Sequence, residues 1–322
     1  MRGEQELPVN SCDRCSAPAV YRRRYSGESL CKRHFCESIE KKVRKELRRF
    51  LSWDSFVGLA VSGGKDSAVM AYIMAKIGRQ FPSMRLAGLI VDEGIEGYRD
   101  KSVVVAERLL SGLGIPYEVF RYDAEFGTRV DRIVHLSGHT NQSCTYCGVL
   151  RRRAIDMLAE RLATEMVLTA HNVDDIAQTI LMNLFQGNVK HLTSQIVLPD
   201  SVKREKPLRG LLEKEVVMYA VLNEIEFYSN PCPYTRFALR NDIRNFLTSM
   251  EEKHSGITYS ILRTAEKIEK SELRVTGRCH RCGRPASAEL CKACEILEYG
   301  RELLLRSQVQ APGGADPWSR RR

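Results

Sequence analysis

A glycine-rich segment between a predicted strand and a predicted helix carries the residues best suited to binding phosphate. The apolar run 57–61 is followed by Ser62, Gly63, Gly64, Lys65, Asp66 and Ser67. Glycines allow the backbone to approach an anion closely, and the amides that open the next helix point toward it. The two serines add hydroxyl donors and Lys65 adds a charge. A turn with a serine cap needs fewer of these residues, and the GxxxxGK[ST] spacing of a Walker A loop is absent.

A second polar cluster follows the predicted strand 166–170. It consists of His171, Asn172, Asp174 and Asp175. Carboxylates are stabilised at the start of a helix, and capping alone could explain the two aspartates. In parallel sheets, however, ligands bind beyond the carboxyl ends of strands, which is where this cluster lies. The cluster is therefore a candidate part of a ligand site.

Three cysteines in the middle of the chain could carry sulfur or iron chemistry. Cys144 and Cys147 form a C-x-x-C motif, and Cys232 stands between two prolines. Prolines and loop residues are poor neighbours for an inert core thiol. Two interpretations remain open on spacing alone. Cys147 and Cys232 could form a persulfide-carrying pair, or all three thiols could bind a [4Fe–4S] cluster with one iron open to another ligand.

The two ends of the chain carry ligand sets with the spacing of structural zinc sites. These sets are Cys12, Cys15, Cys31 and His34, and then Cys279, Cys282, Cys291 and Cys294. Paired C-x-x-C or C-x-x-H units supply four ligands that close a tetrahedron around Zn²⁺. Cys36 is an alternative to His34, but the C-x-x-H spacing matches the other half of the site better. We therefore expect two structural Zn²⁺ ions.

The elements that must position these residues alternate between strand and helix. Strands are predicted over 57–61, 86–91, 117–121 and 166–170, and helices over 68–77, 102–113, 147–163 and 174–185. This alternation predicts an α/β fold, a parallel sheet with helices on both faces. The pattern over 207–269 is mostly helical, with one extended stretch over 226–229, and the loop before Cys144 is rich in small polar residues.

Composition narrows the class of protein. The 322 residues include 50 Lys and Arg against 40 Asp and Glu, a net charge of +10. Such an excess suits a polyanion such as nucleic acid, although solubility would explain the total equally well. Two basic groups, 41–49 and 151–153, flank the candidate site and favour a nucleic-acid surface. We find no run of about 18 apolar residues and no signal peptide, so we expect a cytoplasmic protein without a membrane segment. Eleven cysteines in a reducing compartment indicate metal sites or catalysis.

The loop Ser62–Ser67 resembles the SGGxDS signature of the PP-loop ATP pyrophosphatase superfamily. The resemblance implies a five-stranded sheet, cleavage of ATP between its α- and β-phosphates, and transfer of AMP to a carbonyl oxygen. It also implies that the backbone near Val91 holds adenine and that Asp66 assists Mg²⁺. The segment from Ala170 to Asp175 resembles a GHNxDD motif with alanine replacing the glycine, so Asp175 would contact ATP or its metal.

The cysteine motifs narrow the resemblance further. Cys144 to Arg152, then His171-Asn172, then Cys232 to Tyr234 resemble the tRNA 2-thiouridine synthetases of the TtuA and cytoplasmic thiolation group. This resemblance implies a three-cysteine [4Fe–4S] cluster, which favours the cluster over the persulfide pair, and zinc at both ends. Arg151 stands where some relatives have lysine. A guanidinium cannot deprotonate in a protein, so Arg151 would act only as a fixed positive charge that binds anionic groups.

These resemblances predict an ATP-dependent tRNA sulfurtransferase. The C2 oxygen of a uridine would attack the α-phosphate, and sulfur would then displace AMP to give 2-thiouridine. Lys65, Asp66, Arg151 and Asp175 are the expected catalytic residues. The segments 148–152, 174–179 and 206–208 resemble the archaeal and eukaryotic cytoplasmic wobble-uridine branch more than the branch that thiolates the T-loop. This resemblance implies position 34, with position 54 of the T-loop or a cytidine as the alternatives.

The expected partners are tRNA and a sulfur donor, either a ubiquitin-like thiocarboxylate protein or sulfide, with a homodimer as one assembly to test. The chain divides into a zinc-binding module (1–40), a PP-loop catalytic domain with a basic linker helix (41–270), a zinc ribbon (271–306) and a disordered tail (307–322). The rival from another class is a zinc-ribbon RNA-binding protein whose ATP loop is no longer catalytic.

Overall fold

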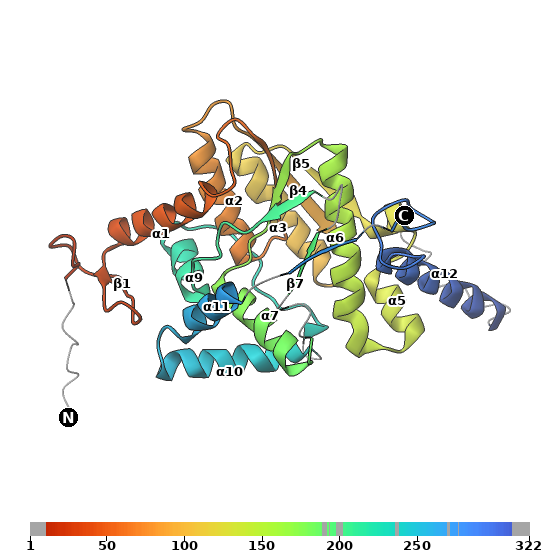
Figure 1. The fold of residues 1–322 in the computed structure, drawn as a ribbon. Coiled ribbons are helices and arrows are strands. Elements are labelled where there is room, and N and C mark those ends of the chain that lie inside the picture. The colour runs from red at the N-terminus through yellow and green to blue at the C-terminus, as the bar shows by residue number, and fades with distance from the viewer. Residues whose placement is uncertain are drawn as a thin grey trace, which may run out of the picture.

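A parallel five-stranded sheet organises the molecule, as expected (Figure 1). The computed structural model describes residues 11–188, 192, 194–197, 202–235, 238–268, 271–275 and 277–310. The strand order is β5-β4-β3-β6-β8. These strands are β3 (Phe56–Ala60), β4 (Arg85–Asp92), β5 (Tyr117–Arg121), β6 (Met166–Leu168) and β8 (Lys203–Glu205). All four neighbouring pairs in this sheet run parallel.

Helices cover both faces of the sheet, and each face has its own apolar core. The helices that contribute to these two cores are α1 (Lys32–Leu47), α2 (Lys65–Gly78), α3 (Arg99–Leu113), α5 (Val130–Ser137), α6 (Ser143–Arg161), α9 (Glu213–Leu222) and α12 (Lys292–Gln310). Ile90 packs with α1, α2, α3 and α9, whereas Leu89 and Val91 pack with α5, α6 and α12. Neighbouring residues of β4 thus face opposite cores, as the twofold periodicity of a strand requires.

The sheet grows in two directions from β3. The chain adds β4 and β5 on one side, then crosses back and adds β6 and β8 on the other. The connections that follow β3 and β6 therefore leave the sheet in different directions. In α/β folds this reversal leaves a crevice beyond the carboxyl ends of the two central strands. The phosphate loop follows β3 and the His171 cluster follows β6, so both lie at that crevice.

Three helices expected from the sequence begin three or more residues earlier than predicted. The helix predicted from residue 68 starts at Lys65, directly after the loop glycines, the helix predicted from residue 102 starts at Arg99, and the helix predicted from residue 147 starts at Ser143. Cys144 and Cys147 therefore both lie on the opening turns of α6. The predicted loop before them instead contains α4 (Tyr122–Phe126), α5 and a 3-10 turn, η1 (Thr140–Gln142). Such short elements contain too few residues to show a recognisable hydrophobic periodicity in the sequence.

The remaining elements flank the crevice. They are α7 (Val173–Phe185), α10 (Leu239–Lys253), α11 (Ile257–Lys267), β7 (Ser194–Val197) and β9 (Ser271–Arg274), and β7 pairs with β9 in parallel. Helices α10 and α11 pack on α7. The predicted extended stretch 226–229 forms no strand within the described residues, and runs as irregular chain instead. No helix of the described residues is long and apolar enough to cross a membrane.

The two terminal modules join the central domain through helices. Helix α1 starts beside the N-terminal ligand set, after the short strands β1 (Tyr21–Arg22) and β2 (Ser29–Leu30), and runs through the proposed boundary at residue 40. At the other end, α12 packs on α5 and α6. It extends to Gln310, so the first residues of the proposed tail are helical, while 311–322 lie outside the described residues.

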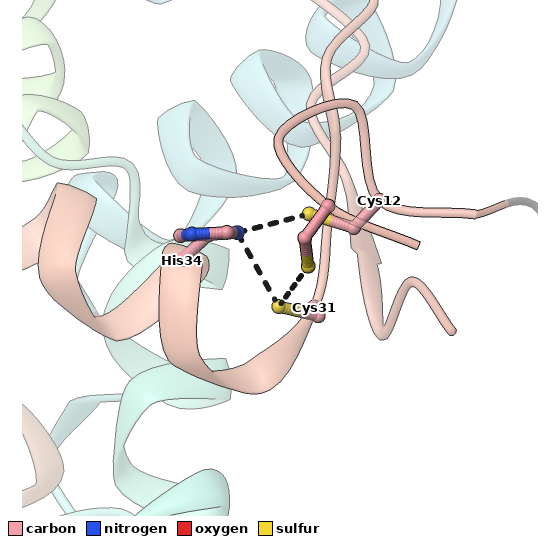
Figure 2. A group of neighbouring side chains, drawn as sticks. Cys12, Cys31 and His34 are labelled. Atoms are coloured by element: carbon pink, nitrogen blue, oxygen red, sulfur yellow. Dashed lines mark hydrogen bonds between the residues drawn. The ribbon is translucent and has the colours of Figure 1, made fainter. Parts of the chain in front are cut away.

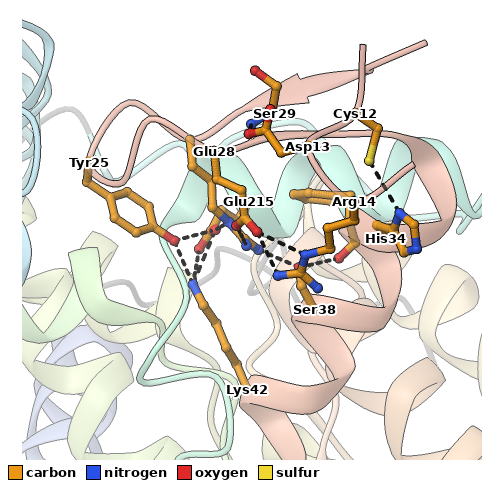
Figure 3. Close-up of polar contacts among 12 residues, drawn as sticks. Cys12, Asp13, Arg14, Tyr25, Glu28, Ser29, His34, Ser38, Lys42 and Glu215 are labelled. Atoms are coloured by element: carbon orange, nitrogen blue, oxygen red, sulfur yellow. Dashed lines mark hydrogen bonds and ion pairs between the residues drawn. The ribbon is translucent and has the colours of Figure 1, made fainter. Parts of the chain in front are cut away.

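A buried carboxylate ties the N-terminal module to the central domain (Figure 3). Glu215 of α9 is fully buried and forms ion pairs with Arg23 at 2.8 Å and with Lys42 of α1 at 3.2 Å. The Tyr25 hydroxyl donates a hydrogen bond to the same carboxylate at 2.9 Å. Burial opposes the charge, but Lys42 and Arg23 outweigh it and lower the pKa of Glu215. The carboxylate is therefore ionised and holds three segments together.

Glu215→Gln leaves two buried cations without their counter-charge, which costs about 3–5 kcal/mol when one partner of a buried pair is removed. We expect a loss of that size in the free energy of unfolding, measured by denaturant titration. The control is Glu37→Gln, which removes an exposed pair with Arg33 on α1 and should cost less than about 1 kcal/mol. Equal losses in both variants would contradict a structural role for the Glu215 pairs.

Candidate active site

The phosphate loop has a backbone shape that only glycine fits. Gly63 has a φ of +84°, and a Cβ at this position would lie 2.1 Å from the carbonyl oxygen of Ser102 on α3. The Ser67 hydroxyl donates to the Gly64 carbonyl at 2.9 Å and accepts from the Ser62 amide at 3.2 Å. The loop is thus folded tightly over the start of α2, whose amides are available to an anion.

A cavity of about 340 Å³ opens at this loop. It is lined by Ala60, Val61, Ser62, Gly64, Asp66, Ser67, Leu89, Val91, Glu93, Arg99, Arg151, Ile155, Thr169, Ala170, His171 and Asp175. The cavity brings together most residues expected to bind ATP, from the ends of β3, β4 and β6. Apolar side chains stand on the sheet side and charged groups surround the loop. This is the composition of a nucleotide site.

Lys65 is paired with two carboxylates beside the phosphate loop. It forms ion pairs with Asp66 at 3.0 Å and with Glu213 of α9 at 2.7 Å, and it is not among the described residues that line the cavity. Burial opposes its charge, but the two carboxylates outweigh burial and raise the pKa of Lys65. In this structure Lys65 is thus a partner of Asp66 and Glu213.

Two carboxylates face the cavity. Asp66 accepts a hydrogen bond from the Asn172 amide group at 3.0 Å, and Asn172 and Asp175 cap α7 reciprocally. Burial raises the pKa of Asp66; Lys65 works in the opposite direction and the nearby Asp175 raises it further. Burial also raises the pKa of Asp175. Two half-buried carboxylates that repel each other provide an environment in which a divalent cation is stabilised.

His171 is neutral in this site. Partial desolvation, together with the cations Lys206, Arg240 and Arg151, lowers its pKa to about 4, although the residue as a whole is exposed. One ring nitrogen lies 3.0 Å from the Thr169 hydroxyl. At neutral pH the imidazole therefore donates or accepts hydrogen bonds without adding charge to an already basic wall.

The three internal cysteines lie close to one another. Cys144 and Cys147 are one turn apart on α6, and Cys232 interacts electrostatically with both. Cys144 is exposed, Cys147 is buried and Cys232 is half-buried. Burial raises the pKa of the Cys147 thiol to about 12, although Arg151 works in the opposite direction. The structure thus brings together residues that are distant in the sequence.

Three cysteine thiols are a donor set that suits an iron–sulfur cluster. The three sulfurs are not among the sets of described ligand atoms that lie within 4.8 Å of one another. Thiolates around an iron–sulfur cluster stand further apart than those around one zinc, because several irons lie between them. Ser143, which precedes Cys144, has a buried hydroxyl with no partner in the described structure.

Both terminal sets are assembled as expected. Each brings its four ligand atoms within 4.8 Å of one another. At the N-terminus, His34 Nδ1 lies 3.3 Å from the Cys12 sulfur and 3.6 Å from the Cys31 sulfur (Figure 2). Cys36 instead accepts a hydrogen bond from the Asn223 side chain at 3.4 Å. The structure therefore places His34, and not Cys36, in the set.

Sequence reasoning missed two residues of the cavity wall. Glu93 follows β4 and Arg99 opens α3, and both side chains are nearly fully buried. Glu93 pairs with Arg99 and also with Arg151. A charged residue directly after an apolar strand is a weak signal, because most such residues are exposed. Only the fold shows that these charges meet.

The sheet changes its direction of growth between β3 and β6, and the glycine loop lies at the cavity that opens there. This combination is that of a PP-loop protein. Residues 36–251 match the model of the PP-loop domain, and residues 11–36 match that of the 2-thiouridine synthetase TtuA, N-terminal LIM domain. Both matches confirm the resemblance found in the loop and the cysteine motifs.

Similar proteins of known name identify the branch of PP-loop proteins to which the chain belongs. The chain is 36% identical over 316 residues to the tRNA 2-thiolation protein NcsA of Haloferax volcanii, covering 89% of this chain and 98% of that one. It is 34% identical over 303 residues to cytoplasmic tRNA 2-thiolation protein 1 of Drosophila pseudoobscura pseudoobscura, covering 91% and 88%. The U34-tRNA thiolase NcsA from Methanococcus maripaludis, solved with its [4Fe-4S] cluster, superposes with a TM-score of 0.78 at 33% identity, covering 92% and 97%. The chain belongs to the tRNA 2-thiolation family of PP-loop proteins.

Gly63→Ala tests the assignment of the loop. The substitution forces a side chain into a left-handed conformation and against the Ser102 carbonyl, a strain of about 1–3 kcal/mol or more. We expect the affinity for ATP, measured by isothermal titration calorimetry, to fall about tenfold or more.

Gly112→Ala is the matched control, because this glycine of α3 has open space around its Cβ position. It should bind ATP as the unaltered protein does. If Gly63→Ala also bound ATP normally, the loop would not be the phosphate site.

Proposed function

We propose that the protein is an ATP-dependent tRNA sulfurtransferase that converts uridine to 2-thiouridine at wobble position 34. The observation that carries this proposal is one contact between two sites. Arg151 lines the nucleotide cavity and its guanidinium lies 3.0 Å from the Cys147 sulfur. The nucleotide site and the sulfur site are thus adjacent. The reaction requires this, because AMP is attached to the same uridine oxygen that sulfur then displaces. The U34-tRNA thiolase from Methanococcus maripaludis supports the choice of position 34.

The phosphate loop would carry the first step. The amides of the loop and the hydroxyls of Ser62 and Ser67 hold the phosphates, with adenine against Val91 and Ala170. Asp66 and Asp175 would bind Mg²⁺ between them. The C2 oxygen of uridine attacks the α-phosphorus and pyrophosphate leaves. Arg151 stands at the same cavity and stabilises charge that develops on the phosphate.

The sulfur site would complete the exchange. A [4Fe–4S] cluster held by Cys144, Cys147 and Cys232 would supply an open iron that carries the incoming sulfur. The relative solved with its [4Fe-4S] cluster supports that choice over a persulfide pair. The sulfur then attacks C2 and AMP leaves with the former uridine oxygen. A ubiquitin-like thiocarboxylate protein and sulfide are both suitable donors.

A second cleft gives RNA a route to the cavity. It has a volume of about 790 Å³ and shares Arg151, Ile155, Thr169, His171 and Asp175 with the nucleotide cavity. Its other lining residues include five cations: Arg152, Arg204, Lys206, Arg209 and Arg240. Phosphate contacts from such groups supply much of the affinity for RNA. The cleft therefore suits the backbone around a uridine that enters the cavity. The names of the relatives also support a cytoplasmic location.

The proposed reaction is tested by nucleoside mass spectrometry on tRNA incubated anaerobically with the reconstituted protein, ATP and sulfide. Unaltered protein should form 2-thiouridine, whereas Asp66→Asn should lower the rate by at least about 100-fold, because a group that orients the metal is lost. Asp100→Asn, an exposed aspartate on α3, should retain full activity.

tRNA from a strain that lacks the protein identifies the position. Loss of 2-thiouridine at position 34 would support the proposal. Loss at position 54, or of 2-thiocytidine, would assign the enzyme to another nucleoside. Intact thiolation, with RNA binding unchanged in Asp66→Asn, would favour the RNA-binding rival.

We also propose that the two terminal sets bind structural Zn²⁺, since each offers four converging ligands and no open position. Elemental analysis of the purified protein should find two zinc ions per chain, one for each set. Cys279→Ser should lose one of them, whereas Cys36→Ser should keep both. Retention of full zinc content by Cys279→Ser would refute the assignment.

A further inference from the structure

A buried carboxylate connects the phosphate loop to the sulfur site. Glu93 lies directly after β4 and its side chain is only 2% exposed. One carboxylate oxygen lies 2.5 Å from Nε of Arg99, and the other lies 2.5 Å from Nε of Arg151. Glu93 therefore bridges two guanidiniums that belong to different helices, α3 and α6.

The Arg99 arm reaches the nucleotide side. Its guanidinium donates a hydrogen bond to the Ser62 carbonyl at 2.8 Å and another to the Val91 carbonyl. It also donates to the Ser102 hydroxyl at 2.8 Å, in the residue whose carbonyl lies against Gly63. Arg99 thus fixes the first residue of the loop relative to the end of β4, where adenine is expected.

The Arg151 arm reaches the sulfur side. Its Nη2 lies 3.0 Å from the Cys147 sulfur, one turn earlier on α6. Because the Glu93 carboxylate holds Nε of the same guanidinium, the plane of Arg151 is fixed between the carboxylate and the sulfur. Without Glu93, a long side chain that is partly exposed would have several rotamers available.

The charges in this network leave a positive excess. Arg99 and Arg151 contribute two positive charges and Glu93 one negative charge, which leaves one positive charge beside Cys147. Burial opposes the charge on Glu93, but Arg151 and Arg99 outweigh it and lower its pKa. The network is therefore matched to an anionic sulfur ligand at Cys147, and loss of the carboxylate would place two guanidiniums against each other.

We propose that Glu93 is a positioning residue for both halves of the reaction: it holds Arg99 against the phosphate loop and Arg151 against the Cys147 sulfur. This inference rests on the proposed function, because it assigns a role in joining adenylation to sulfur transfer. Residues that orient the groups in direct contact with a metal site typically change affinity or activity by about 10–100-fold when altered.

The test compares Glu93→Gln with Glu215→Gln in the full-length protein. Both substitutions remove the charge of a buried, doubly ion-paired carboxylate, so both should destabilise the fold. Two quantities are measured in each: the ATP affinity of iron-free protein by calorimetry, and the electron paramagnetic resonance spectrum of protein reconstituted anaerobically with iron and sulfide and then reduced.

We expect Glu93→Gln to weaken ATP binding about tenfold and to shift the resonance spectrum. Glu215→Gln should lower the melting temperature but leave ATP affinity and spectrum unchanged. A folded Glu93→Gln with normal ATP affinity and a normal spectrum would overturn the proposal, because Glu93 would then be structural only.

A second variant covers the case in which Glu93→Gln does not fold. Arg99→Lys keeps the charge but cannot hold the Ser62 and Val91 carbonyls together, so it should weaken ATP binding by a similar factor. If Arg99→Lys bound ATP normally, the proposal would also fail. Where both variants fold, the double variant should bind ATP no more weakly than either single one, since the two residues act through the same contact.

Neither readout requires turnover, so the outcome is independent of the thiolation assay. An unaltered protein that thiolates no tRNA would reject the proposed function even if Glu93 affected both sites. If the unaltered protein took up no iron, the sulfur side would be measured as the rate of Cys147 alkylation by iodoacetamide, mapped by mass spectrometry. A changed rate in Glu93→Gln, but not in Glu215→Gln, would support the inference, and equal rates would oppose it.

Discussion

The site depends on the point at which the parallel sheet reverses its direction of growth. Strands β3 and β6 are neighbours, yet the segments that follow them turn to opposite sides. Their carboxyl ends consequently leave a space that no later strand fills. The glycine loop closes one side of this space and the Asn172 cap closes the other. Asp66 and Asp175 take their positions from the first turns of the helices that begin at this place, whereas Arg151 reaches the space from the middle of α6.

The parts of the site that the sequence predicted are those in which function depends on short spacing. The loop glycines, the Asp175 cluster and the two terminal ligand sets each lie within a short stretch of sequence. Residue types and their intervals were therefore sufficient to identify these groups. The parallel sheet followed from the alternation of strands and helices. The expected order of elements was confirmed, with helix starts shifted toward the loop and toward Cys144.

Contacts between distant segments were beyond the reach of sequence patterns. Arg23 and Glu215 meet across 192 positions, and Arg151 and Glu93 across 58. The same holds for Lys65, whose second partner Glu213 comes from a helix placed only by the fold. An ionisable side chain carries no local signal of burial or partner, since most such residues face solvent. The network that joins the two halves of the site consists almost entirely of such residues.

The irregular segment that precedes Cys232 also contacts the phosphate loop. The Tyr228 amide donates a hydrogen bond to the Gly63 carbonyl at 2.8 Å, four positions before the cysteine. During synthesis, Cys144 and Cys147 leave the ribosome long before this segment does, and strand β8 and helix α9 are made in between. The segment that supplies the third thiol is thus held against the phosphate loop by a backbone contact. A chain that ends before Cys232 has Cys144 and Cys147 but lacks both the third thiol and this contact.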